Sequence, residues 1–128
     1  MAKPIRILLA DDHPLFLEGV AASLVAEDFQ VIAQAGSGEA AVNLALDLRP
    51  DMVLLDVNMP FKDGFTVLEE IRSDPAVQHI PVIILTAARL DPADMQSALN
   101  MGADDYVTKP FDRRELLARI RTRLRVKE

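Results

Sequence analysis

Short apolar runs alternate with segments of helical periodicity along the chain. Five runs are rich in aliphatic residues and are bounded by polar or turn-forming residues, as is typical of buried strands. We predict strands at Ile5–Ala10, Phe29–Ala35, Met52–Leu55, Ile80–Leu85 and Ala103–Val107. Short apolar strands that alternate with amphipathic helices indicate a parallel sheet with helices on both faces.

The segments between the runs carry apolar residues at intervals of three and four, which is the spacing of one helix face. Proline, glycine and capping residues mark their ends. Five helices are predicted: from Pro14 to about Glu27, from Ser37-Gly38 to Pro50, from Gly64 to Asp74-Pro75, from Asp91 to Gly102, and from Asp112 onward. The chain is therefore predicted to be a doubly wound α/β fold, although periodicity alone does not give the strand order.

Composition narrows the class of protein. A length of 128 residues with 50% hydrophobic residues suits one domain with a substantial core. There is no cysteine, which excludes thiol catalysis, Cys-ligated zinc and disulfide scaffolds, and the two histidines, His13 and His79, are far apart in sequence. No apolar run has the length of a membrane span. We expect residues 1–128 to form a single domain, without an effector domain, in the cytoplasm.

Charge is distributed unevenly. The net charge is −6; the segment Asp112–Glu128 has seven basic and three acidic residues (+4), so residues 1–111, with seven and seventeen, carry −10. An acidic body repels phosphate backbones, so we expect no direct nucleic-acid binding. It suits a hard cation or a basic partner. The basic segment is interpreted as a solvated helix face.

Polar residues interrupt the pattern where the predicted strands end. Asp11 and Asp12 follow the first strand, Asp56 ends the third, Thr86 ends the fourth and Lys109 follows the fifth. In open α/β sheets, ligands bind at the carboxyl ends of the strands. If these four strands are neighbours, the five side chains line one crevice.

Three carboxylates in contact repel one another, at roughly 4 kcal/mol per pair for a separation of about 4 Å and an effective dielectric constant of 20. Mg²⁺ offsets such repulsion and is held by carboxylates, water and phosphate oxygens. A carboxylate beside Mg²⁺ and an ammonium group is equipped to attack phosphorus. The cluster therefore suggests phosphoryl transfer onto an aspartate.

Each residue also has a plain interpretation when taken singly. Asp11 and Asp12 suit helix caps, Thr86 a strand or capping residue, and Lys109 a solvated surface lysine. Asp56 is harder to explain, because it interrupts an apolar run and an unpaired buried charge is costly. The coincidence of compatible polar residues at four strand ends favours the functional interpretation.

Four separated motifs stand in a specific order and spacing. They are Leu8–Pro14 (LLADDHP), Leu54–Pro60 (LLDVNMP) with Asp63-Gly64, Ile84–Ala87 (ILTA) and Gly102–Phe111 (GADDYVTKPF). Along essentially its whole length, the chain thereby resembles the receiver domain of two-component response regulators. The resemblance implies a flavodoxin-like, CheY-like sheet of order 2-1-3-4-5 with five helices.

The resemblance also implies residue roles. Asp56 is the phosphoacceptor, and Asp11, Asp12, Asp56 and the backbone carbonyl of Asn58 hold Mg²⁺, or Mn²⁺. Thr86 and Lys109 contact the phosphoryl group, and Thr86 and Tyr106 form the switch. The site residues thus comprise Asp11, Asp12, Asp56, Asn58, Thr86, Tyr106 and Lys109.

The implied activity is phosphorelay signalling. A histidine kinase or phosphotransfer protein donates the phosphoryl group, and the surface of the fourth helix, fifth strand and fifth helix then controls an output partner or domain. The chain would be no enzyme beyond its own phosphorylation and dephosphorylation. Asp105, Glu115 and Arg119 match inter-subunit ion pairs of one subfamily, so a homodimer through that surface is one assembly that the resemblance allows.

Two other functions use related chemistry. A Mg²⁺-dependent phosphohydrolase is disfavoured because Asn58, rather than a second acidic residue, stands two positions after Asp56. A nucleotide or flavin carrier is disfavoured because Asp11-Asp12-His13-Pro14 replaces the glycines of a phosphate cradle.

Overall fold

The computed structural model describes residues 5–11, 22, 29–56, 64–87, 96, 99–100, 102–109 and 112–125. Within these residues, the strands are β1 (Ile5–Ala10), β2 (Phe29–Ala35), β3 (Met52–Asp56), β4 (Val82–Ala87) and β5 (Asp105–Lys109). The helices whose ends lie within the described residues are α2 (Gly38–Leu48), α3 (Gly64–Ser73) and α5 (Arg113–Arg125).

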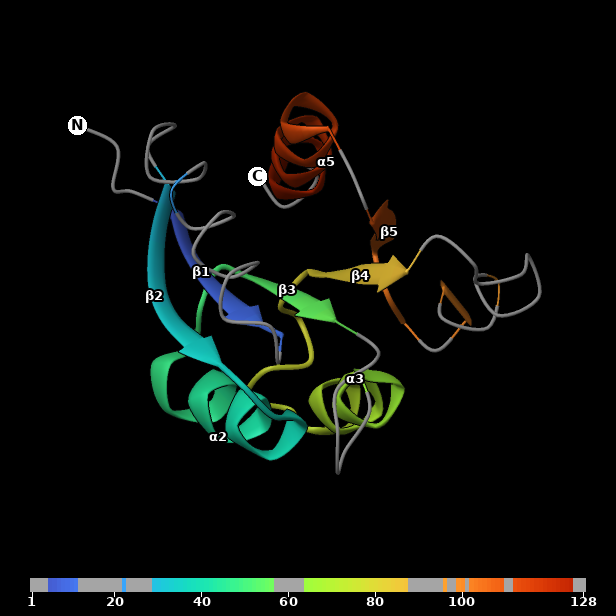
Figure 1. Ribbon diagram of the computed structural model, residues 1–128. Coiled ribbons are helices and arrows are strands. Elements are labelled where there is room, and N and C mark those ends of the chain that lie inside the picture. The colour runs from blue at the N-terminus through green and yellow to red at the C-terminus, as the bar shows by residue number, and fades with distance from the viewer. Residues whose placement is uncertain are drawn as a thin grey trace.

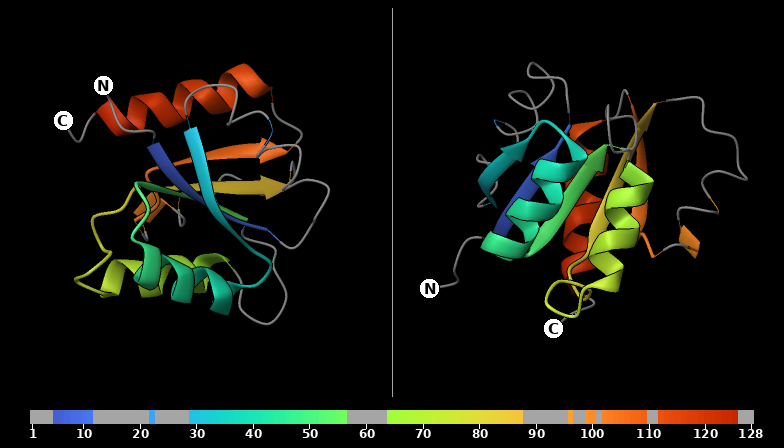
Figure 2. Two further views of the ribbon diagram at one scale, coloured as in Figure 1. Left: turned by 90° about the vertical axis from the view of Figure 1, so that its left-hand side faces the viewer. Right: turned by 90° about the horizontal axis from the view of Figure 1, so that it is seen from below.

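The strands form one parallel sheet in the order β2-β1-β3-β4-β5. This order confirms the predicted flavodoxin-like fold. Figure 1 shows three layers, with α2 and α3 on one face of the sheet and α5 on the other, and Figure 2 gives the same arrangement from two further sides. The predicted first helix and most of the predicted fourth lie outside the described residues.

Alternation along the strands divides the core between the two faces. In β1, Leu8 and Ala10 belong to the core beneath α2 and α3, whereas Ile7 and Leu9 belong to the core beneath α5. Strand β3 is buried at every position. The near-continuous apolar runs in the sequence follow from this two-sided burial.

The helices begin and end as local chemistry dictates. Ser37 caps α2 by accepting a hydrogen bond from the backbone N–H of Ala40 at 3.2 Å. The helix ends at Arg49, whose φ of 46° is left-handed. Asp112 caps α5 by accepting from the N–H of Arg114 at 2.6 Å, as predicted.

Two strands begin later than the sequence pattern predicts. Strand β4 starts at Val82 rather than at residue 80, because Pro81 has no N–H for the ladder. Strand β5 starts at Asp105 rather than at residue 103. Both strands continue beyond their predicted ends, and the additional residues pair Thr86 with Thr108 and Ala87 with Lys109.

Candidate functional site

The carboxyl ends of four parallel strands bring four of the predicted site residues to one edge of the sheet. We call this edge the rim; it is defined by Asp11, Asp56, Thr86 and Lys109. Ala10 pairs with Leu55, so Asp11 and Asp56 are the next residues along adjacent strands. Neighbouring strands lie about 4.8 Å apart, which makes the two aspartates first neighbours across the sheet.

Both aspartates of the rim are deeply buried. Asp11 is 0% exposed and Asp56 is 1% exposed. The backbone N–H of Asp11 donates to the carbonyl oxygen of Ala35 at 2.9 Å, which holds the end of β1 against the end of β2. Both Asp11 and Asp56 interact with neighbouring groups of the protein. Two carboxylates buried side by side are electrostatically costly, so their environment has to favour or neutralise negative charge.

A hard divalent cation fits this pair. Carboxylate oxygens are the ligands that Mg²⁺ takes from proteins, usually one or two together with water. Within the described part of the chain, no group of three or more His, Cys, Asp or Glu residues gathers to hold a metal. The other two predicted ligands, Asp12 and Asn58, lie outside the described residues.

The remaining predicted residues come from β4 and β5. Asp56 pairs with Leu85, so Thr86 is one residue further along the strand next to β3. Lys109 ends β5 opposite Ala87. The backbones of Thr86 and Lys109 are thus placed at the rim, whereas their side chains lie outside the described structure.

Tyr106 lies below the rim. It pairs with Ile84, two positions before Thr86, and its half-buried side chain packs against the core beneath α2 and α3. Its backbone N–H donates to Oδ1 of Asp105 at 2.9 Å. Positions 84 and 86 face the same side of β4, so Tyr106 and Thr86 are placed on one face of the sheet.

Asp105, Glu115 and Arg119 interact within one chain. Arg119 Nη1 contacts Asp105 Oδ1 at 2.8 Å, and Arg119 Nε contacts Glu115 Oε1 at 3.3 Å. Arg123 Nε lies 3.6 Å from Asp105 Oδ2. The hydrogen bond that Arg119 donates to Asp105 raises the pKa of the Arg119 guanidinium, despite the opposing effect of burial. These residues therefore fasten α5 to β5.

A second arginine cluster was not anticipated from the sequence. Arg72 of α3 pairs with Asp104, the residue before β5, at 2.8 Å. The motif Gly102–Phe111 contains Asp104, but nothing in the sequence pattern links it to an arginine 32 positions earlier. Only the fold brings the end of α3 beside the start of β5.

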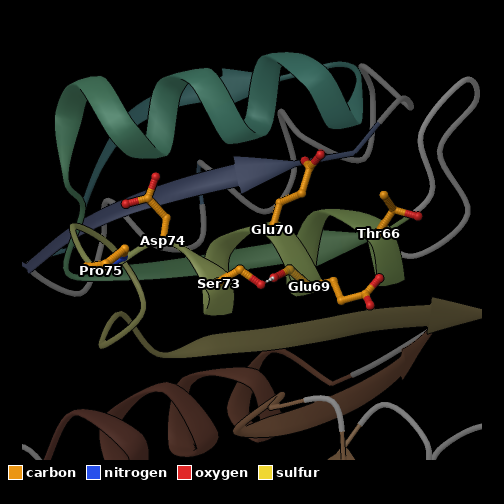
Figure 3. A pocket seen from close by; sticks show the side chains of 6 residues that line it. All are labelled: Thr66, Glu69, Glu70, Ser73, Asp74 and Pro75. Atoms are coloured by element: carbon orange, nitrogen blue, oxygen red, sulfur yellow. Dashed lines mark hydrogen bonds between the residues drawn. The ribbon is translucent and has the colours of Figure 1, made fainter.

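An acidic hollow runs along α3, separate from the rim residues. Its lining residues are Thr66, Glu69, Glu70, Ser73, Asp74 and Pro75. Figure 3 shows Glu70 and Asp74 on the side of α3 toward α2, with Glu69 and Ser73 on the other side. The lining contains three acidic residues and no basic residue, as expected of a solvated helix face.

The model of the response regulator receiver domain family matches residues 7–121. The DNA-binding response regulator MtrA of Mycolicibacterium smegmatis is 43% identical over 123 residues, which are 96% of this chain and 52% of MtrA. The response regulator PleD of Caulobacter vibrioides is 42% identical over 95% of this chain and 26% of PleD. The chain thus spans about half the length of MtrA and about a quarter of PleD.

Solved structures agree with this similarity. A putative response regulator from Chloroflexus aurantiacus superposes with a TM-score of 0.89 at 32% identity, covering 95% of this chain and 98% of that one. The receiver domain of a sensor histidine kinase from Pseudomonas aeruginosa superposes with a TM-score of 0.85 at 32% identity, covering 94% and 98%. That structure holds a magnesium ion in its active-site cleft.

Proposed function

Because the chain belongs to the response regulator receiver domain family, we propose that Asp56 accepts a phosphoryl group in a reaction that requires Mg²⁺ or Mn²⁺. The observation that carries the proposal is the burial of Asp11 and Asp56 side by side at the rim. Two buried carboxylates without a cation would be a source of repulsion; with one, they form a phosphoryl-transfer site.

The carboxylate of Asp56 is the nucleophile. One of its oxygens forms a bond to phosphorus as the bond from phosphorus to a histidine nitrogen of the donor breaks, and that nitrogen retains the electron pair. Asp11, Asp12 and the backbone carbonyl of Asn58 hold the metal together with Asp56. When bound, the metal neutralises charge on the transferring oxygens. The donor is a histidine kinase or a phosphotransfer protein.

Thr86 and Lys109 act on the product. The ammonium group of Lys109 pairs with a phosphoryl oxygen, and the hydroxyl of Thr86 donates to another. Tyr106 lies on the same face of the sheet as Thr86, two residues deeper. Movement of Thr86 toward the phosphoryl group releases space that the Tyr106 ring fills, which gives a two-state element for phosphorylation to bias.

The altered surface consists of the predicted fourth helix, β5 and α5. It controls an output partner or an attached domain. The chain spans about half of MtrA, a DNA-binding response regulator, and about a quarter of PleD, so these two relatives have further sequence outside the matched region. In the described part of the chain, no helix has the length and apolarity of a membrane span.

Intrinsic fluorescence offers a direct test, because Tyr106 is the only tyrosine and the chain has no tryptophan. Mg²⁺ with beryllofluoride, which mimics a phosphoryl group on an aspartate, should change the Tyr106 signal in a saturable manner. Asp56→Asn should abolish the change. Asp47→Asn, at an exposed position of α2, is the control for loss of one negative charge and should retain it. A wild-type protein that gives no response contradicts the proposal.

A further inference from the structure

Arg72, the penultimate residue of α3, donates hydrogen bonds to four acceptors. Its Nε reaches the carbonyl oxygen of Gly102 at 2.8 Å, and its Nη2 reaches Oδ2 of Asp104 at 2.8 Å. Its Nη1 reaches the carbonyl oxygens of Gln78 at 3.0 Å and Ile80 at 2.6 Å. One half-buried guanidinium thus joins the end of α3, the connection before β4 and the connection before β5.

Asp104 extends this network into the sheet. Its Oδ2, which contacts Arg72, also accepts a hydrogen bond from the backbone N–H of Val82 at 2.8 Å. In return, the N–H of Asp104 donates to the carbonyl oxygen of Val82 at 2.9 Å. The residue before β5 is therefore paired, through both backbone and side chain, with the first residue of β4.

Gly102 provides the space for the arginine. Its φ is +111°, a backbone conformation that residues with a side chain rarely adopt. A Cβ at this position would lie 2.9 Å from both Cγ and Nε of Arg72. The backbone before β5 and the Arg72 side chain are thus packed so closely that an added Cβ would require the arginine to shift.

Strand β5 depends on contacts outside the sheet, such as those of Arg72, more than the inner strands do. It has five residues, lies at the edge of the sheet, and pairs within the sheet with β4 alone. A slip of one residue would move Lys109 by about 3.3 Å and turn Tyr106 to the opposite face. The position of both residues relative to Asp56 therefore requires the register of β5 to be fixed.

We propose that Arg72 is a positioning residue of the phosphorylation switch: through Gly102 and Asp104, it fixes the start of β5 and so sets the places of Tyr106 and Lys109. The inference rests on the proposed function for its consequence at Asp56, but the fixing of β5 is independent of any ligand. Arg72 acts from the amino-end side of the sheet and is not placed at the rim.

The test compares Arg72→Met with Arg6→Met. Arg6 is a matched control, because it also donates to backbone carbonyl oxygens, those of Leu48 at 2.8 Å and Arg49 at 3.1 Å, but it fastens the end of α2 instead of β5. Three quantities are measured for each variant: the urea midpoint, amide hydrogen exchange of Asp105–Lys109, and the beryllofluoride concentration that half-saturates the Tyr106 response with Mg²⁺.

Both variants should unfold at lower urea concentration. Only Arg72→Met should exchange the β5 amides faster than its loss of global stability accounts for. Only this variant should require more beryllofluoride than wild type for half-saturation, by about two- to thirtyfold, which is the usual range for a coupling residue outside the site. Arg72→Lys should fall between, because an ammonium group reaches fewer of the four acceptors than the guanidinium. Equal exchange and equal half-saturation in the two methionine variants overturn the inference.

The outcomes for Arg72 and for Asp56 are separable. If wild type gives no beryllofluoride response, the proposed phosphoacceptor function fails, while hydrogen exchange in β5 still decides the role of Arg72. If Arg72→Met does not fold, Gly102→Ala replaces it, because the added methyl displaces Arg72 without removing its charge. Unchanged β5 exchange in Gly102→Ala overturns the inference.

Discussion

Replacing Asp56 by asparagine should stabilise the protein in the absence of magnesium. Asp11 and Asp56 are 0% and 1% exposed and lie next to each other at the ends of adjacent strands. At about 5 Å, close to the strand spacing, two like charges repel by about 3 kcal/mol when the effective dielectric constant is about 20. Asparagine retains the shape of the side chain, removes one charge and offers an amide donor to the neighbouring carboxylate.

The gain should be about 1–3 kcal/mol, with the upper end set by the full pairwise repulsion. In a domain of this size, each kcal/mol raises Tm by about 4 °C. Magnesium at about one hundred times its Kd should stabilise wild type by about 2.7 kcal/mol. The variant should gain much less, because one of the two buried carboxylates proposed to bind the cation is lost.

Thermal unfolding followed by circular dichroism, in EDTA and in saturating Mg²⁺, measures both effects. Asp47→Asn makes the same charge change at an exposed site on α2 and should leave both Tm values close to those of wild type. An Asp56→Asn protein that is less stable than wild type in EDTA, or that is stabilised by Mg²⁺ to the same extent, would refute the argument from repulsion.

Three further substitutions test the roles of Lys109, the Asp105–Arg119 contact and the core at Leu54. Lys109→Ala should leave Mg²⁺ affinity by calorimetry largely intact and weaken the beryllofluoride response of Tyr106; loss of the fold instead would make this lysine structural. Asp105→Asn should lower the free energy of unfolding in urea by about 1 kcal/mol, because the contacts with Arg119 are partly screened by solvent; an unchanged midpoint would contradict this. Leu54→Ala removes a fully buried side chain from β3 and should cost about 2–5 kcal/mol by the same measurement, whereas a cost below that range would mean that the core closes around the cavity.

The architecture could be predicted from the sequence because strands that are buried on both faces of a sheet consist of nearly continuous apolar residues. Strand β3 shows this plainly, since it is buried at every position up to and including Asp56. The starts of β4 and β5 were predicted two residues early. Ile80 and Ala103 are apolar and buried, but they belong to connections, because ladder pairing begins only after Pro81 and Asp104.

The placement of two candidate site residues was predictable in the same way. Asp11 and Asp56 stand out in sequence because charges interrupt apolar runs, and the register places them side by side. The network of Arg72 was not predictable, because an arginine at a helix end looks like a solvated residue until the fold places Gly102 and Asp104 beside it. Asp105 and Arg119 match inter-subunit ion pairs of one subfamily by sequence, and only the structure shows that they also pair within the chain.

Asp56 is proposed to take the phosphoryl group, and locating that group on the chain tests the proposal. The protein is incubated with Mg²⁺ and a small acyl phosphate, the aspartyl phosphate is trapped by borohydride reduction, and the modified residue is identified by peptide mass spectrometry. Modification is expected at Asp56, dependent on Mg²⁺ and absent from Asp56→Asn. Modification of another residue at the same level, or none in the intact protein, would contradict it.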